Sequence, residues 1–299
     1  MSKTLKIVTI SGGKDSTATA IWALEKYPKE QLRFVFCDVK WENKVTYQYI
    51  KYLESALNID VIRLVSKKYF GFADMVLKLG RFPSSQRRFC TSELKVKPMI
   101  DYLLELQQDF IVIQGIRADE SEERKSANMI DDYFYNYFTP YGFDKTGKPK
   151  YHTYRAKEVK EHCKIYKAGV YRPILNWKAQ ETFDLMKSKG IEPNPLYKRG
   201  SKRVGCYPCI LCTQNEVNLI HEQEPKELIQ LAAFEKYAKS TFFYPKFIPE
   251  RFRTLLTSKG KKVASTEDVI KYISDDPMQT SLFKKPTINS CQSIYTICE

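Results

Sequence analysis

The chain has 299 residues, enough to bury a sizeable core in one large domain or in one domain with an appendage. Lysine and arginine total 49 against 35 aspartate and glutamate, which gives a formal net charge of +14. This charge favours an anionic partner such as a nucleotide, RNA or DNA, although solvated surface lysines would give the same total. There is no amino-terminal signal segment and no apolar run of about 18 residues, so we expect a soluble, cytoplasmic protein without a membrane partner.

An apolar run at residues 5–10 predicts a buried strand, and residues 18–24 predict a helix shortly after it. The two glycines of the turn between them let the backbone approach an anion closely. The start of the helix directs unpaired N–H groups and the positive end of its dipole at that anion. We therefore interpret the turn as a phosphate site, with an ordinary glycine turn that caps a helix as the alternative. Its residues are Ser11, Gly12, Gly13, Lys14, Asp15, Ser16 and Thr17.

Three more apolar segments predict strands at residues 32–37, 61–65 and 110–115. Helical segments alternate with them at residues 43–57, 70–79 and 92–107. This alternation predicts a parallel sheet flanked by helices, with right-handed crossovers. In such sheets, ligands bind at the carboxyl ends of the strands, so the loops after these strands should converge on one cleft.

Polar residues follow two of these strands. Asp38 comes directly after the second, Gly115 ends the fourth, and Arg117, Glu120 and Arg124 follow closely. A carboxylate there could accept a hydrogen bond from a ribose or bind Mg²⁺, and the forked donors of arginine could hold phosphate oxygens. Helix caps and surface ion pairs are the alternative for any single one of these residues.

The chain has eight cysteines, which in a cytoplasmic protein are thiols or metal ligands more often than disulfides. Cys206, Cys209 and Cys212 form a Cys-x-x-Cys-x-x-Cys run, and Cys90 lies far upstream. Two-residue spacing lets neighbouring thiolates reach one metal centre. The pattern favours a 4Fe–4S cluster, with zinc and unmetallated thiols as alternatives.

The glycine turn resembles the PP-loop of the ATP pyrophosphatase superfamily, whose members cleave ATP between the α and β phosphates. An ordered series of motifs over roughly residues 5–215 looks like the phosphoadenosine phosphosulfate reductase branch of that superfamily. The series comprises Asp38 with Glu42 and Thr46, then residues 115–121, residues 172–174 with Trp177, residues 194–197 and residues 203–209.

This resemblance implies a Rossmann-like α/β fold of the adenine nucleotide alpha hydrolase type, with ATP and Mg²⁺ as ligands. It implies catalytic roles for Lys14, Asp15 and Arg117. Members of the family that carry a cluster pair an upstream cysteine, followed by a Lys-Val-x-Pro-like stretch, with a downstream Cys-x-x-Cys. Cys90 precedes the similar residues 95–98, and Cys212 is the least secure ligand because the resemblance ends near Cys209.

Two departures from the reductase pattern bear on the substrate. Reductases resemble one another in a C-terminal Glu-Cys-Gly-Leu/Ile-His motif, for which this chain offers only Cys298-Glu299. They also tend to have an eroded PP-loop, whereas this one is intact. Both features favour ATP and make the chain more similar to the sulfur-transfer proteins of phosphorothioate DNA modification and tRNA thiolation.

We therefore expect an AMP-forming, pyrophosphate-releasing adenylating enzyme of sulfur transfer. Its acceptor would be a nucleic acid, DNA or tRNA, and its sulfur donor could be a protein such as a cysteine desulfurase. One alternative is a sulfonucleotide reductase that uses Cys298. The other is a non-catalytic nucleotide-binding subunit of a DNA-modification or defence complex.

The sequence predicts two regions, a PP-loop domain over residues 1–215 and a helical C-terminal region over residues 216–299. An insertion near residues 126–170 is rich in tyrosine and lysine, which could stack on bases and neutralise phosphates, or could form a plain surface hairpin. In the C-terminal region, residues 216–239 predict one or two helices broken at Pro225, and residues 265–273 predict a capped helix. The pattern assigns no role to Cys291.

Overall fold

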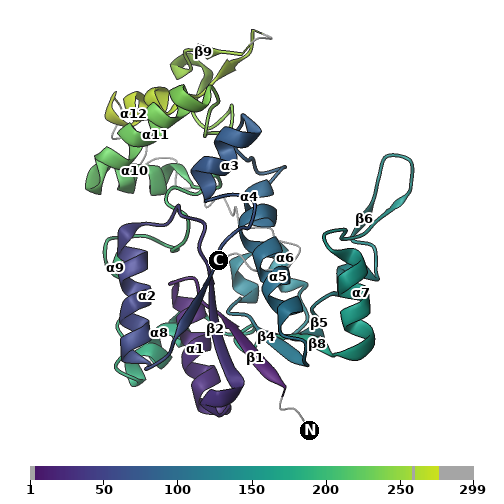
Figure 1. Cartoon of the computed structure of the whole chain (residues 1–299). Helices are drawn as coiled ribbons and strands as arrows, with labels where there is room; N and C mark the ends of the chain where they lie inside the picture. Colours follow the sequence, from purple (N-terminus) through teal and green to yellow (C-terminus); the bar gives the residue numbers. More distant parts are fainter. Residues whose placement is uncertain (1–3, 258–259, 276–299) are drawn as a thin grey trace.

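The computed structural model describes residues 4–257 and 260–275, and a six-stranded sheet lies at its centre (Figure 1). The strand order is β3-β2-β1-β4-β8-β5, with β5 antiparallel to β8 and the other pairs parallel. The strands are β1 (Leu5–Thr9), β2 (Leu32–Cys37), β3 (Val61–Leu64), β4 (Phe110–Ile113), β5 (Ile130–Asp132) and β8 (Ala168–Tyr171). This sheet confirms the predicted Rossmann-like α/β fold.

Helices cover both faces of the sheet, which explains why its central strands are mostly apolar. One face packs against α1 (Lys14–Lys26) and α2 (Lys44–Ala56), which enclose Val8, Phe34 and Ile113. The helix α8 (Ala179–Ser188) extends this layer through a contact of Met186 with residues of α1 and α2. The other face packs against α5 (Lys97–Glu105) and α7 (Ala156–Ile165).

The segment predicted as one helix over residues 92–107 has a more complex backbone. A short α4 (Phe89–Thr91) leads into a π-helical stretch (Ser92–Val96), and α5 follows. Pro98 lies in the first turn of α5, where its missing N–H leaves no helical hydrogen bond unmade. The other predicted helices agree with α2 and with α3 (Phe72–Leu79).

The tyrosine-rich stretch is only partly a surface feature. Tyr133, Phe134 and Tyr137 are buried in the core between β4 and α5, and β5 adds an edge strand. The hairpin of β6 (Gly142–Phe143) and β7 (Pro149–Lys150) instead stands away from the body of the molecule (Figure 1). The stretch also contains a 3₁₀ turn (Tyr135–Tyr137) and is preceded by another (Ala118–Glu120) and by α6 (Glu122–Lys125).

The C-terminal region shares a core with α3. Buried residues of α3, among them Phe72 and Met75, form one cluster with Leu228, Phe242 and Tyr272. Figure 1 shows this region and α3 together at one end of the molecule. Its elements are α10 (Gln214–Gln223), α11 (Pro225–Ala238), a 3₁₀ turn (Glu250–Phe252), β9 (Leu255–Leu256), β10 (Lys262–Val263) and α12 (Thr266–Asp275).

Two remaining short elements are a 3₁₀ turn (Lys29–Gln31) before β2 and α9 (Pro195–Lys198). Among the described helices, none is long and apolar enough to cross a membrane. Cys291 and Cys298 lie outside the described residues.

Candidate functional site

The glycine turn joins β1 to α1 at the carboxyl end of the sheet, and contacts from distant parts of the chain brace it. Gly12 has a φ of +80°, and a Cβ there would meet Cγ2 of Thr46 at 2.9 Å, so both the backbone and the space require glycine. The side chain of Asn194 donates to the Gly12 carbonyl at 3.1 Å. The N–H of Lys14, at the start of α1, donates to the Tyr197 hydroxyl at 2.9 Å. The turn is therefore held in one shape.

Hydroxyl groups of the turn complete its internal hydrogen bonding. The Ser11 N–H donates to Oγ of Ser16 at 3.1 Å, and the Gly13 N–H donates to Oγ of Ser11 at 3.3 Å. The Thr17 hydroxyl donates to the Gly13 carbonyl at 2.9 Å. These residues keep the anion-binding end of α1 ordered.

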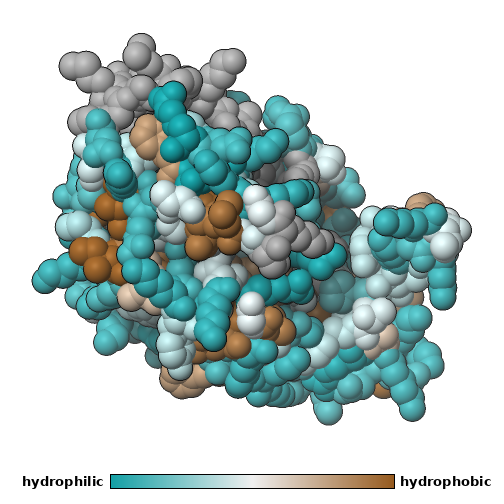
Figure 2. Space-filling model, turned by 90° about the horizontal axis from the view of Figure 1, so that it is seen from above, coloured by the Kyte–Doolittle hydropathy of each residue, from teal (hydrophilic) through white to brown (hydrophobic). Residues whose placement is uncertain are grey.

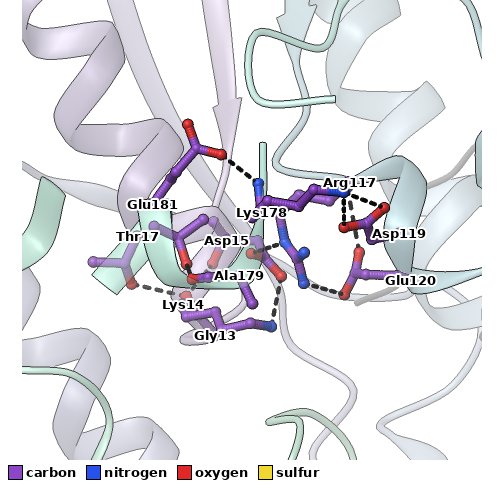
Figure 3. A network of polar contacts seen from close by, with 12 residues as sticks. Gly13, Lys14, Asp15, Thr17, Arg117, Asp119, Glu120, Lys178, Ala179 and Glu181 are labelled. Atoms are coloured by element: carbon purple, nitrogen blue, oxygen red, sulfur yellow. Dashed lines mark hydrogen bonds and ion pairs between the residues drawn. The ribbon is translucent and has the colours of Figure 1, made fainter. Parts of the chain in front are cut away.

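Asp15 is fully buried between two cations (Figure 3). Its Oδ2 lies 2.8 Å from Nζ of Lys14, and its Oδ1 lies 2.6 Å from Nε of Arg117. Lys14 and Arg117 are themselves only 7% and 5% exposed. One carboxylate between two cations leaves a net positive charge, and burial strengthens its attraction for an anion. The structure thus brings together the three residues predicted to be catalytic.

A second carboxylate joins the two arginines after β4. Glu120 forms ion pairs with Arg117, at 4.0 Å, and with Arg124, which is 4% exposed. Lys178, just before α8, pairs with Asp119 at 3.0 Å and anchors the same loop on the other side (Figure 3). The arginines predicted to hold phosphates are therefore fixed by acidic side chains of their own loop.

Gly115 allows this loop to reach the glycine turn. A Cβ at residue 115 would lie 2.8 Å from the Asp15 carbonyl oxygen, from Cα of Ser16 and from Oγ1 of Thr19. Only glycine permits the end of β4 to pack this closely on the first turn of α1. This close approach places Arg117 against Asp15.

A cavity with an empty volume of about 560 Å³, partly open to solvent, lies beside the glycine turn. Ile10, Phe36 and Ile116 provide apolar walls, and Ser11 and Ser16 provide polar groups at one end. An apolar wall next to a phosphate turn suits a purine nucleotide.

Asp38, predicted to contact a nucleotide or Mg²⁺, makes contacts with residues of the segment that follows it. Among the described residues, Asp38 is not one that lines the cavity. Its Oδ1 accepts from the Lys40 N–H at 2.9 Å and from the Tyr47 hydroxyl at 2.8 Å, and its Oδ2 lies 2.7 Å from Nζ of Lys40. Burial and this hydrogen bond raise the pKa of Tyr47. The carboxylate of Asp38 thus orders the loop after β2, whereas Glu42 lines the cavity.

Three of the four predicted cysteine ligands line a second cavity of about 540 Å³. They are Cys90, Cys206 and Cys209, and they share the cavity with Arg88 and Arg203. Lys95, in the π-helical stretch, lines both this cavity and the cavity beside the glycine turn, so the two cavities adjoin. π-helical turns occur frequently at functional sites.

Cys212 lies apart from this cavity. It is buried in the core of the C-terminal region, and with Cys206 and Cys209 it lines a third, neighbouring cavity. Its N–H donates to the Cys209 carbonyl at 2.9 Å. The structure therefore places Cys90, Cys206 and Cys209 around one cavity and Cys212 at the neighbouring one.

The sequence predicts that these cysteines hold a metal centre. Within residues 4–257 and 260–275, no three Cys, His, Asp or Glu side chains are placed to hold a metal ion together. A zinc site needs its ligands around one ion, whereas an iron–sulfur cluster binds each thiolate through a different iron and accepts wider spacing. Burial raises the pKa of the Cys206 thiol, so binding a metal there would release a proton. The described residues therefore do not support the predicted 4Fe–4S cluster as a preformed site.

Several residues of the site were not among the predicted site residues. Asn194 and Tyr197 belong to a motif of the resemblance, but no spacing connects them to a turn about 180 residues away. Arg88 has both terminal guanidinium nitrogens buried without a hydrogen-bond partner among the described residues, beside the cysteines. Lys95 could be found only from the structure, because its importance lies in joining two cavities.

Comparisons with known proteins show which family the chain belongs to. Residues 6–212 match the family described as the phosphoadenosine phosphosulfate reductase domain. An uncharacterized 37.8 kDa protein from the gpa 5′ region of Escherichia phage 186 is 30% identical over 356 aligned positions, covering 99% of this chain and 97% of that protein. An uncharacterized protein of Methanocaldococcus jannaschii is 26% identical over 223 positions, covering 74% of this chain but only 39% of its own length.

Two crystal structures are also similar in part. Phosphoadenylyl-sulfate reductase from Candida auris, in a phosphate complex, has 15% identity and a TM-score of 0.46, over 70% of this chain and 84% of that one. FMN adenylyltransferase from Candida glabrata, with FAD and inorganic pyrophosphate, has 13% identity and a TM-score of 0.43. The match covers 69% of this chain and 56% of that one. Since the family match spans more than half of the chain, this protein belongs to the nucleotide-binding PP-loop superfamily, in the phosphoadenosine phosphosulfate reductase domain family.

Proposed function

We propose that this protein is an ATP-dependent adenylating enzyme of sulfur transfer that acts on a nucleic acid. The observation that carries the proposal is the buried group of Lys14, Asp15 and Arg117 at an intact PP-loop, beside a cavity with apolar walls. A loop of this kind suits a nucleotide with a β–γ pyrophosphate to hold, which ATP has and an adenylyl sulfate lacks.

The residues of the site suit attack at the α phosphorus of ATP. An acceptor oxygen would bond to this phosphorus as the bond to pyrophosphate breaks, and a sulfur nucleophile would then displace AMP from the acceptor. Lys14, Arg117 and the N–H groups at the start of α1 would stabilise the charge on the leaving pyrophosphate. Asp15 would hold both cations in position, and Mg²⁺ bound with ATP would neutralise further charge.

The cysteine cavity supports the sulfur half of the proposal. Cys90, Cys206 and Cys209 would hold a 4Fe–4S cluster, with Cys212 as a prospective fourth ligand after a local rearrangement and zinc as the alternative metal. Such a centre would supply a place to carry or orient sulfur. Lys95 lies between this cavity and the nucleotide cavity, where its charge could attract an anionic sulfur species and the α phosphate.

A nucleic acid acceptor is supported by the net charge of +14. The donor of sulfur would be a separate protein such as a cysteine desulfurase. The test is to incubate anaerobically purified protein with Mg²⁺, ATP, sulfide as the sulfur nucleophile and either DNA or tRNA, and in parallel with phosphoadenylyl sulfate and a dithiol reductant, and to measure AMP, pyrophosphate and sulfite. The proposal predicts equal amounts of AMP and pyrophosphate without sulfite. Sulfite released from an adenylyl sulfate would instead indicate a reductase, and ATP bound without turnover would indicate a nucleotide-binding subunit.

A further inference from the structure

The hairpin of β6 and β7 carries two kinds of exposed side chain on its two faces. Phe143 pairs with Pro149, and Gly142 pairs with Lys150. Because side chains alternate between the faces of a strand, Phe143 and Pro149 lie on one face, and Lys148 and Lys150 lie on the other. Phe143 is 65% exposed and Tyr141, two residues before it, is 47% exposed.

The charge of the hairpin is almost entirely positive. Lys145, Lys148 and Lys150 are all exposed. Asp144 is the single acidic residue between Tyr141 and Tyr151, and its carboxylate accepts hydrogen bonds within the turn. The donors are the Thr146 N–H at 2.8 Å, the Thr146 hydroxyl at 2.7 Å and the Lys148 N–H at 3.0 Å. Asp144 therefore shapes the turn, while the lysines surround it.

The hairpin makes no contribution to the buried core that would explain these aromatic side chains. The described clusters of buried residues contain neighbours such as Tyr137 and Val159 but not Phe143 or Tyr141. Seen from above, the hairpin projects beyond the rest of the surface (Figure 2). Its tip points toward the end of the molecule where the carboxyl ends of the strands lie (Figure 1).

We propose that the hairpin is an arm that binds unpaired nucleotides of a nucleic acid. Exposed aromatic rings can stack on bases whose faces are free, which a duplex does not offer except at its ends. The lysines of the turn and of the opposite face would contact phosphates where the strand continues around the hairpin. An acidic protein could use the lysines but would leave Phe143 and Tyr141 without matching flat partners.

This inference deepens the proposed function and rests on it, because it identifies the surface that would bring the acceptor to the nucleotide site. The arm stands at the edge of the molecule beyond α7, and its tip points toward the same end as the carboxyl ends of the strands (Figure 1). It would position an unpaired stretch of the acceptor, while Lys14 and Arg117 act on ATP.

The test uses the full chain and fluorescent oligonucleotides of one sequence, single-stranded and duplex, without ATP. We expect tighter binding to the single strand. Phe143→Ala should weaken that binding about 5- to 150-fold, the effect of losing one stacked base. Tyr237→Ala is the matched control, since Tyr237 is 74% exposed on α11, and it should bind as the wild type does. All variants are checked for unchanged thermal unfolding.

The lysines are tested by the salt dependence of binding. Replacing Lys145, Lys148 and Lys150 with serine should lower the slope of log affinity against log salt by about 2. The control replaces Lys26, Lys51 and Lys187, three exposed lysines on the helix layer of the other face of the sheet. The control has the same change in net charge and should alter the slope much less.

Equal binding by Phe143→Ala and the wild type, or equal slopes for the two triple variants, would overturn the inference. Self-association of the wild type that is lost in Phe143→Ala, without nucleic acid binding, would also overturn it and assign the arm to a second copy of the chain. Pyrophosphate release is measured separately. If pyrophosphate release persists while the hairpin variants bind nucleic acid normally, the inference about the hairpin fails and the proposed function stands. If nucleic acid binding depends on the hairpin but no pyrophosphate is released, the proposed function fails and the inference about the hairpin stands.

Discussion

At the scale of single residues, the account depends on Asp15 and the two cations that it holds. Lys14→Ala and Asp15→Ala should each lower pyrophosphate release by about 100-fold or more, since removing a preorganised charge partner has effects of this size. Lys164→Ala is the control, because Lys164 on α7 forms an exposed ion pair with Glu161, and such pairs contribute little. Normal release from both PP-loop variants would remove the loop from the mechanism.

Asp15→Ala should also affect stability, because it leaves Lys14 and Arg117 buried without their carboxylate. Breaking one side of a buried pair typically costs about 3–5 kcal/mol. Lys14→Ala leaves Asp15 paired with Arg117 and should cost less. Chemical denaturation of the two variants measures this difference, and equal stability would show that the burial of these charges has little energetic weight.

Gly115 is the residue on which the approach of β4 to α1 depends. Gly115→Ala should destabilise the protein by about 1–3 kcal/mol, because the added Cβ would lie 2.8 Å from the backbone of α1. Gly169→Ala on β8 is the matched control, because its Cβ would meet Ile111 at an ordinary 3.5 Å. If the two variants unfold at the same temperature, the close packing at residue 115 is not required.

At the scale of elements, the cysteine cavity joins the segment before α5 to the loop after α9. Cys206→Ser and Cys90→Ser should lose bound iron and lower the unfolding temperature, because the binding energy of a metal at such a site is partly folding energy. Cys163→Ser, on α7, should retain the iron. Iron and sulfide are measured on anaerobically prepared protein. Stoichiometric zinc without iron would support a metal site at these cysteines but contradict an iron–sulfur cluster. Protein without any metal, and with freely reactive thiols, would contradict a metal site there.

The C-terminal helices and α3 should unfold together, because they share one core. Leu228 is fully buried in that core, and Leu228→Ala should cost about 2–5 kcal/mol. Its neighbour Ile229 is 62% exposed, so Ile229→Ala is a control of nearly the same chemistry and position. Calorimetry should show one transition that shifts in Leu228→Ala. A separate low-temperature transition that alone responds to the variant would make the C-terminal region an independent unit.

At the scale of the whole molecule, the parts that could be predicted from the sequence are those with local signals. The strands β1, β2, β3 and β4 are short apolar runs, and the glycine turn between β1 and α1 has a distinctive composition. The sequence does not predict β8 or the edge strand β5. Residues 130–132 contain two aspartates and residues 168–171 contain a glycine, so neither has the apolar pattern of a central strand.

The site shows the same division between local and distant information. Lys14 and Asp15 are neighbours in sequence, and their place in the phosphate turn is predicted from that turn alone. The contact of Tyr197 with the turn and the position of Lys95 between two cavities depend on how distant segments pack. Ligands bind at the carboxyl ends of parallel strands, but not every polar residue there faces the ligand. Asp38 follows β2 as expected, yet its carboxylate accepts hydrogen bonds from Lys40 and Tyr47.

The measurement that tests the central claim most directly is exchange of labelled pyrophosphate into ATP by anaerobically purified protein with DNA or tRNA present. Adenylation of the acceptor is reversible, so an adenylating enzyme should return label to ATP, and Lys14→Ala should abolish the exchange. Exchange that requires one of the two nucleic acids would also identify the acceptor. Absence of exchange with either acceptor, from wild-type protein that binds ATP, would contradict the account.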